Sequence, residues 1–253
     1  MKATTVCASV LSTLILGGMV VSAAESPSTP NESLTTHGHV EVKTGNIDPE
    51  GGLIDPEKPD ETIPEGEIPD VKPNPNPNMG PLEITHAPEL QFGEVKTSNN
   101  DVTKHAEANE YGDETRGAIL QFGDLRTEAY GYTVTATMTQ QFIQDTNELK
   151  GATITFTNPH AATKEGATGA RPTIEDSFEL VKGEAATVAT ADKANLKEGK
   201  GMWVVEYGSS ANVGEGGDTT GESVQLTIPA NTASSMAGGT YVSDIEWSIT
   251  AAP

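Results

Sequence analysis

Short runs in which apolar and polar residues alternate recur along the chain from residue 81 to residue 253. Between Tyr132 and Thr139 every even position is apolar or aromatic and every odd position is threonine. The same alternation covers residues 152–157 and 223–228. A period of two places successive side chains on opposite faces of a β-strand, and a face of small hydroxyl residues is typical of an antiparallel sheet with one wet side. The pattern predicts an all-β, antiparallel β-sandwich over residues 81–253.

Two further alternating runs carry the only two tryptophans in the sequence. In the first run, Trp203, Val205 and Tyr207 share one face. The apolar face of the second run consists of Tyr241, Ile245, Trp247 and Ile249. In both runs an aliphatic residue follows the tryptophan by two positions, so the pair lies on one side of a predicted strand.

The two tryptophan runs resemble the paired W-x-L motifs of the WxL domain, a family found on the surface of low-GC Gram-positive bacteria. The longer second motif of that family reads Tyr, three residues, Leu, Thr, Trp, one residue, Leu, three residues, Pro. This chain has Tyr241, Ile245, Glu246, Trp247, Ile249 and Pro253 at those positions. Val205, Ile245 and Ile249 stand in place of leucine, which keeps shape and face. Glu246 replaces threonine and adds a charge to the face that we expect to be solvated.

Two other stretches support the resemblance, which covers about residues 81–253. Asp124-Leu125-Arg126 followed by Gly131-Tyr132 is similar to the family's Asp-x-Arg and Gly-Trp pattern, and Gly151-Ala152 is similar to its later strand start. The resemblance implies a secreted, extracellular protein at the cell wall surface. It also implies non-covalent attachment to the wall, to peptidoglycan or an associated polymer, beside other surface proteins of the same kind.

The N-terminal 80 residues differ in composition from the rest of the chain. Residues 1–24 have a basic start, an apolar run and small residues after it, which predicts a signal peptide. The only cysteine, Cys7, lies inside this segment. Residues 25–80 hold most of the prolines and no aromatic residue, so we expect a disordered, acidic, proline-rich linker that builds no core. No later apolar run is long enough for a transmembrane anchor.

The sequence also contains an internal repeat and one segment whose pattern fits neither a helix nor a strand fully. Leu90–Lys96 and Leu120–Arg126 match in residue type at all seven positions, which predicts two strands that each end on a glycine bend. Residues 185–197 are the best helical candidate, although Thr187, Val188 and Thr190 argue against a helix.

The acidic charge excludes several kinds of partner. The formal net charge is -22, and both the predicted linker and the predicted sandwich are acidic. No basic stripe exists, so nucleic-acid binding is excluded. Long-range attraction to an anionic wall polymer is excluded as well, and wall affinity must come from short-range stacking and hydrogen bonds.

The candidate binding residues are the aromatic residues of the two motifs, namely Trp203, Tyr207, Tyr241 and Trp247. Such rings suit stacking on the apolar faces of sugars. The alternative is that all four form one aromatic cluster in the core, since tryptophan on an inward strand face is commonly buried. The exposure of Trp203 and Trp247 separates these two interpretations.

No metal site, cofactor or catalytic constellation can be argued from the sequence. The five histidines do not cluster, and no His-Glu-x-x-His motif is present. The acidic stretches Glu110–Glu114 and Gly214–Asp218 lack the regular ligand spacing of a calcium loop. Neither a Gly-x-Ser-x-Gly elbow nor a Ser/His/Asp set occurs, and Arg126 and Arg171 are interpreted as ion-pair partners.

Three functions follow from this sequence. The first is a wall-attached surface protein, a subunit of a larger surface complex. The second is an interaction subunit that binds a partner protein and no glycan. The third is a carbohydrate-binding adhesin that recognises a polysaccharide other than the cell's own wall. An enzyme is not expected.

Overall fold

The computed structural model describes residues 38–48, 51–64, 67, 71–73, 80–127, 130–195, 197–213 and 217–252. The chain divides into two compact units, residues 1–41 and 42–253, and the architecture below is that of the second unit. The predicted signal peptide, residues 1–24, lies outside the described residues, as does part of the predicted linker.

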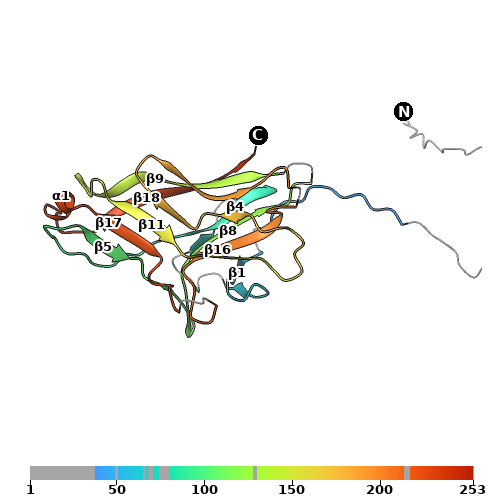
Figure 1. The fold of residues 1–253 in the computed structure, drawn as a ribbon, viewed down its shortest axis with the longest axis horizontal. Coiled ribbons are helices and arrows are strands. Elements are labelled where there is room, and N and C mark those ends of the chain that lie inside the picture. Colours follow the sequence, from blue (N-terminus) through green and yellow to red (C-terminus); the bar gives the residue numbers. More distant parts are fainter. Residues whose placement is uncertain are drawn as a thin grey trace, which may run out of the picture. The chain divides into compact units, whose positions relative to one another are not determined.

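Antiparallel strands make up nearly all of the regular structure in this part of the chain, which confirms the all-β prediction (Figure 1). The first sheet, here called the β8 sheet, has the order β12 (Pro159–Ala162), β16 (Gly201–Tyr207), β8 (Ala118–Asp124), β4 (Leu82–Pro88) and β3 (Val71–Pro73). The β9 sheet contains β10 (Asn147–Glu148), β9 (Tyr132–Gln144), β15 (Ala185–Ala191) and β13 (Thr173–Ile174), with β18 (Val242–Ala251) also paired to β9. The β11 sheet has the order β14 (Ser177–Leu180), β11 (Thr153–Thr157), β17 (Val224–Ile228) and β5 (Val102–His105).

Two small hairpins and one helical turn complete the unit. β1 (Leu53–Ile54) pairs with β2 (Thr62–Ile63), and β6 (Asn109–Tyr111) pairs with β7 (Glu114–Arg116). The short helix α1 covers Ala230–Ala233. No helix in the described ranges is long and apolar enough to cross a membrane.

One hydrophobic core lies between the three large sheets. Phe156 of β11 packs edge-on against Tyr207 of the β8 sheet and against Trp247 of the β9 sheet, with ring centroids 5.1 Å and 5.8 Å apart. Phe178 of β14 stacks on Phe156 at 4.6 Å. These rings connect all three layers, so the predicted sandwich is built from three sheets that share one interior.

Strand β9 shows how the sequence alternation becomes structure. Its apolar even positions, such as Val134 and Met138, are fully buried, while the threonines between them remain partly exposed. Ala136 lies opposite Trp247 on the neighbouring β18, and a small residue there leaves room for the indole ring. The prediction of an inward apolar face and an outward threonine face is confirmed for this strand.

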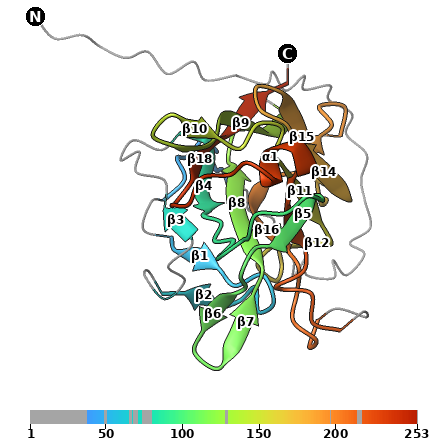
Figure 2. The same cartoon turned by 90° about the vertical axis from the view of Figure 1, so that its left-hand side faces the viewer.

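The β8 sheet is covered on both faces, because residues 51–64 fold over its outer side. We call residues 51–64 the clasp; it contains β1 and β2, which lie beside β6 and β7 (Figure 2). Leu53, Ile54 and Ile63 of the clasp are buried against Ile119 and Val204 of the sheet. Burial of each such side chain contributes about 1.5–3 kcal/mol relative to exposure.

The expectation that nothing in residues 25–80 builds a core is therefore wrong for the clasp. The absence of aromatic residues suggested a linker, but three aliphatic residues are enough to close a small apolar contact on an existing sheet. The prolines of this stretch do not prevent β pairing, since β1 and β2 avoid them.

Two local predictions can also be compared with the structure. The stretch Leu90–Lys96 is not a strand, although its matching copy forms most of β8. Gly93 has a positive φ of 61°, and the backbone N–H of Glu107 donates to the carbonyl of Gln91 at 2.7 Å, so this copy is held as a loop. Residues 185–191, the start of the best helical candidate, form strand β15, as their β-branched residues suggested.

Candidate functional site

Trp203 lies in the interior of the fold. Its side chain on β16 is only 4% exposed, and its indole N–H donates to the carbonyl of Lys200 at 3.1 Å. Val205, the aliphatic partner in the motif, is fully buried on the same face. A ring with a satisfied N–H and no accessible face supports the core interpretation for this tryptophan.

Tyr207 is buried as completely as a residue can be. Its ring packs edge-on against both Phe156 and Phe178. Its hydroxyl is buried and has no hydrogen-bond partner among the described residues, and burial raises the pKa of the phenol far above its usual range. The side chain therefore packs the core and offers no surface for a polymer.

Trp247 is half-buried on β18 and contacts the same aromatic cluster. Its ring lies edge-on to Phe156 at 5.8 Å and to Phe178 at 6.3 Å. Ile245 and Ile249 share this partly buried inner face, whereas Glu246 points to solvent on the other face, as expected. The two tryptophan motifs thus meet through β11 and β14, and the second motif closes the core from one side.

Tyr241 is the motif aromatic that borders an open groove. Its side chain is partly exposed, and its hydroxyl donates to the carbonyl of Ala237 at 3.1 Å. The groove has a volume of about 520 Å³ and lies between the loop 90–97 and the loop 236–241. We call this the Tyr241 groove.

The lining of the Tyr241 groove combines rings, aliphatic floor and polar rim. Phe92 lines one side, and its ring lies edge-on to Phe142 at 6.0 Å. The aliphatic floor consists of Leu149, Leu226 and Ile228. The exposed polar side chains of the rim are those of Gln91, Thr97 and Thr240. Glu94 is the charged side chain among the lining residues. Aromatic and aliphatic surface with a few uncharged hydrogen-bonding groups suits a neutral ligand such as a sugar chain.

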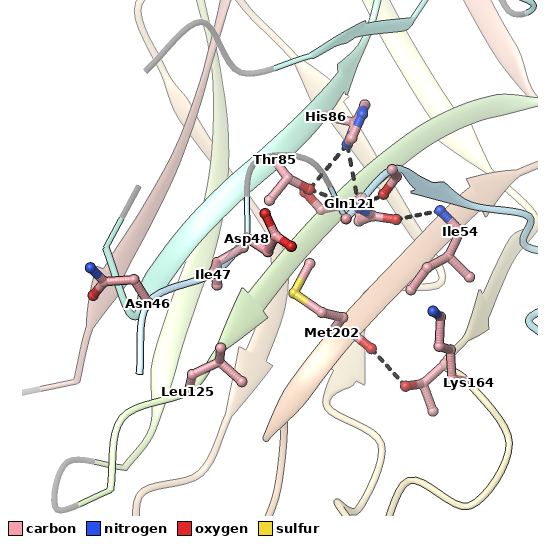
Figure 3. Close-up of a pocket in the computed structure, with 13 residues that line it drawn as sticks. Asn46, Ile47, Asp48, Ile54, Thr85, His86, Gln121, Leu125, Lys164 and Met202 are labelled. Carbon is pink, nitrogen blue, oxygen red and sulfur yellow. Dashed lines mark hydrogen bonds between the residues drawn. The ribbon is translucent and has the colours of Figure 1, made fainter. Parts of the chain in front are cut away.

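A second pocket lies between the clasp and the outer face of the β8 sheet (Figure 3). It has a volume of about 300 Å³, and Gln121 of β8 is its central polar residue. The Gln121 amide nitrogen donates to the carbonyl of Gly52 at 2.9 Å, and the backbone N–H of Ile54 donates to the amide oxygen at 2.7 Å. The amide therefore holds the clasp to the sheet. His86 lies beside it, and burial lowers the pKa of His86 to about 4.

A buried ionic cluster holds the clasp at its other end. The guanidinium of Arg116 is 1% exposed and donates to both oxygens of Asp55 at 2.9 and 2.8 Å. It also contacts Glu57 at 3.3 Å and Glu114 at 2.8 Å. Burial by itself would raise the pKa of Asp55, but the hydrogen bonds from Arg116, those from the backbone N–H groups of Glu57 and Lys58, and the charge of Arg116 together outweigh burial and lower that pKa.

Glu206 of β16 lies close to this cluster. It accepts a hydrogen bond from the backbone N–H of Gly117 at 2.7 Å, while its second oxygen is buried and has no partner in the described part of the chain. Burial raises the pKa of Glu206 to about 8, and the charge of Glu57 adds to the effect. Glu206 is therefore largely protonated at neutral pH.

The charged residues singled out in the sequence serve mainly as structural partners. Arg126 makes a two-point ion pair with the buried Asp124 and donates to the carbonyl of Gly131, in line with its interpretation as an ion-pair partner. Glu114 is engaged by Arg116 and Lys58. No group of three metal-ligating side chains occurs among the residues described, and residues 214–216 lie outside them.

The sequence predicted only some of the residues that form these sites. Of the four candidates, Tyr207 and Trp247 share one cluster, Trp203 lies in the same core, and Tyr241 stands apart at the groove. It missed Phe92 and the group Thr85, His86 and Gln121. The sequence did carry a signal for Gln121, because it is the one polar residue in the otherwise apolar stretch Ala118–Phe122. Nothing in the sequence indicated that the clasp would cover it.

A comparison with known protein families gives one match. The family model for the WxL domain, described as surface cell wall-binding, matches residues 29–253. No curated protein and no solved structure matches the chain.

Proposed function

The chain belongs to the WxL domain family of surface cell wall-binding domains, and we propose that it attaches non-covalently to peptidoglycan through the Tyr241 groove. On this proposal the protein is secreted and held at the outer face of the wall without a chemical tether. The observation that carries the proposal is the groove itself. Tyr241 is the motif aromatic that lines it, whereas Trp203 and Tyr207 are buried and the half-buried Trp247 packs against the core.

The chemistry of the groove fits the glycan part of peptidoglycan. A sugar ring has an apolar face that stacks on Tyr241 or Phe92, and hydroxyl and amide groups that the polar rim can bind. The net charge of -22 opposes any anionic polymer at long range, so a neutral glycan bound at short range is the ligand that the chain's charge permits.

Co-sedimentation with purified peptidoglycan tests the proposal. We expect the native protein to sediment with the sacculi, and to stay bound in about 1 M salt, where charges are screened beyond about 3 Å. Tyr241→Ala should raise the dissociation constant at least about tenfold, which corresponds to the loss of about 1.4 kcal/mol of contact. Tyr130→Ala is the matched control, because Tyr130 is a partly exposed tyrosine that packs on Lys200 and does not line the groove.

Two outcomes would contradict the proposal. Equal binding by the Tyr241→Ala and Tyr130→Ala variants would place the attachment surface elsewhere. Absence of binding to sacculi, together with binding to a soluble polysaccharide of another source, would favour the adhesin.

A second candidate function, the subunit of a surface complex, has its own supporting observation. Strand β18 is ten residues long and pairs with β9 alone among the strands of the described chain. Its exposed side chains include Asp244 and Glu246. Such an edge can accept a strand from a partner protein, and a partner with basic residues would complement these acids.

Capture of surface proteins from the parent cell's envelope tests this second candidate. The bait is the native protein, compared with a variant that carries Asp244→Lys and Glu246→Lys. A partner that binds the native bait and is lost with the double variant supports pairing along β18, whereas equal capture by both excludes it.

A further inference from the structure

Thr85, His86 and Gln121 bring together, beneath the clasp, the groups that an acyl transfer uses (Figure 3). Thr85 is 3% exposed and Gln121 is 2% exposed. They lie on the paired strands β4 and β8, whose register shifts between Ile84 and His86. This shift gives β4 one extra residue at Thr85, and the Thr85 hydroxyl oxygen lies 2.9 Å from the amide nitrogen of Gln121.

His86 is positioned to take the proton of the Thr85 hydroxyl. The Thr85 hydroxyl donates to the backbone carbonyl of Gln121 at 3.3 Å, and His86 Nδ1 lies 3.1 Å from Thr85 Oγ1, so the hydroxyl can turn to this nitrogen, which is within the reach of a general base. Burial lowers the pKa of His86 to about 4, so the imidazole is neutral at pH 7 and has a lone pair for the proton. A hydroxyl in contact with a neutral base is the arrangement that activates serine and threonine as nucleophiles.

The side-chain amide of Gln121 is held as the electrophile. Its oxygen accepts the 2.7 Å hydrogen bond from the Ile54 N–H, which would stabilise negative charge on that oxygen during attack. Its nitrogen donates to the Gly52 carbonyl and lies 3.3 Å from His86 Nδ1. One imidazole nitrogen therefore contacts both the nucleophile and the leaving nitrogen.

We propose that Thr85 and Gln121 form an intramolecular ester that cross-links β4 to β8. The Thr85 oxygen attacks the side-chain carbonyl carbon of Gln121, and His86 takes the hydroxyl proton. His86 then delivers this proton to the amide nitrogen, the C–N bond breaks, and ammonia leaves. One C–O bond replaces one C–N bond, and no oxidant, metal or cofactor enters the balance.

The clasp has two functions in this reaction. Ile54 supplies the N–H that polarises the carbonyl, and Gly52 orients the leaving nitrogen, so the reaction needs the clasp in place. The clasp also covers the amide, which favours attack by the threonine over attack by water. The adjoining pocket of about 300 Å³ gives ammonia a path away from Gln121. A covalent link here strengthens a fold whose one cysteine, Cys7, lies outside the sandwich.

Mass spectrometry of the full-length secreted protein tests the ester. We expect an intact mass that is one ammonia molecule below the mass calculated from the observed N-terminus of the secreted protein to Pro253. After trypsin, the peptide 117–126 should remain joined to the peptide that ends at Lys96, and hydroxylamine should separate the two.

Variants make the assignment specific. Thr85→Val and Gln121→Glu should each abolish the link, and His86→Ala should slow its formation at least about a hundredfold, the low end of what a general base contributes. Gln141→Glu is the matched control and should keep the link, because Gln141 is equally buried and bonds only to backbone groups. If Thr85→Val does not fold, the intact mass and the joined peptides of the native protein still test whether the ester forms.

Two results overturn the proposal. One is a folded native protein with separate peptides and Gln121 unchanged. The other is conversion of Gln121 to glutamate to the same extent in the native protein and in Thr85→Val. Conversion in the native protein alone supports an ester that was later hydrolysed.

Discussion

Single buried polar side chains set the pH response of this domain. Glu206 and Asp55 lie near the same arginine, yet their pKa values move in opposite directions. Asp55 receives two hydrogen bonds from Arg116 and stays ionised. Glu206 receives one backbone hydrogen bond, and its other oxygen is buried without a partner among the residues that the structure describes. Contact with the guanidinium, more than proximity to it, decides which acid keeps its charge.

Replacement of Glu206 by glutamine should change how stability depends on pH. The folded pKa of Glu206, about 8, lies above the unfolded value of 4.5, so folding binds a proton between these values. Stability from this group is complete below about pH 4.5 and is lost as pH rises through about 8. The Glu206→Gln variant should therefore gain about 3–5 kcal/mol over the native protein between about pH 5 and 9.

Urea unfolding of both proteins across this pH range measures the difference. Glu179→Gln is the control, because Glu179 is exposed on β14. A native-minus-variant difference that stays constant with pH would contradict the assignment of a protonated Glu206.

Truncation of the two motif tryptophans to alanine should lower the free energy of unfolding by different amounts. Trp203→Ala removes a ring that is 4% exposed and should lower the free energy of unfolding by about 3–5 kcal/mol. Trp247→Ala removes a half-buried ring and should cost less, because part of its surface already contacts water. Chemical denaturation measures both, and a larger cost for Trp247 would contradict the burial described here.

At the scale of elements, the sequence predicted strands well where one face is wet and poorly where both faces are covered. β9, β11 and β17 follow from their alternation, since one side of each meets solvent. The outer face of β8 carries Ile119 and Gln121, and both are buried because the clasp arrives from a distant part of the sequence. The repeat Leu90–Lys96 failed as a strand for a related reason: the residue pattern matches β8, but the local hydrogen bonds form a loop.

The candidate site was also predicted in part, since local motifs indicated single residues but not their tertiary contacts. Tyr241 followed from the motif, whereas the groove around it depends on two loops that lie far apart in the sequence. The burial of Tyr207 follows from Phe156 and Phe178, and no local pattern predicts that contact.

The clasp should detach when its ionic anchor is broken. Asp55→Ala leaves Arg116 buried without its main partner, which costs about 3–5 kcal/mol for a buried pair. We expect faster amide exchange of residues 53–63 in this variant, while exchange in β9 and β11 stays slow.

A compensating triple variant separates charge from packing. Asp55→Leu combined with Arg116→Met removes both charges of the pair, and Glu57→Gln is added so that no buried carboxylate is left without its cation. Slow exchange in the clasp should then return, since apolar replacement of a buried pair is close to neutral. Fast exchange in the triple variant would show that the hydrogen bonds of the pair, rather than the cost of an unpaired charge, hold the clasp.

At the scale of the whole molecule, the second motif connects folding with attachment. β18 closes the core through Trp247 and begins beside Tyr241, which lines the open groove. One strand therefore completes the sandwich and places the residue that we propose to contact the wall. This arrangement explains how an acidic domain whose tryptophans pack in or against the core can still present a ring-lined groove in which Glu94 is the charged side chain.

Amide hydrogen exchange in the presence of soluble peptidoglycan fragments tests this account most directly. We predict slower exchange in residues 90–97 and 236–241 when fragments are added, with no change in the clasp. Slower exchange confined to the clasp or to another surface, or no change at either loop at saturating fragment concentration, would contradict it.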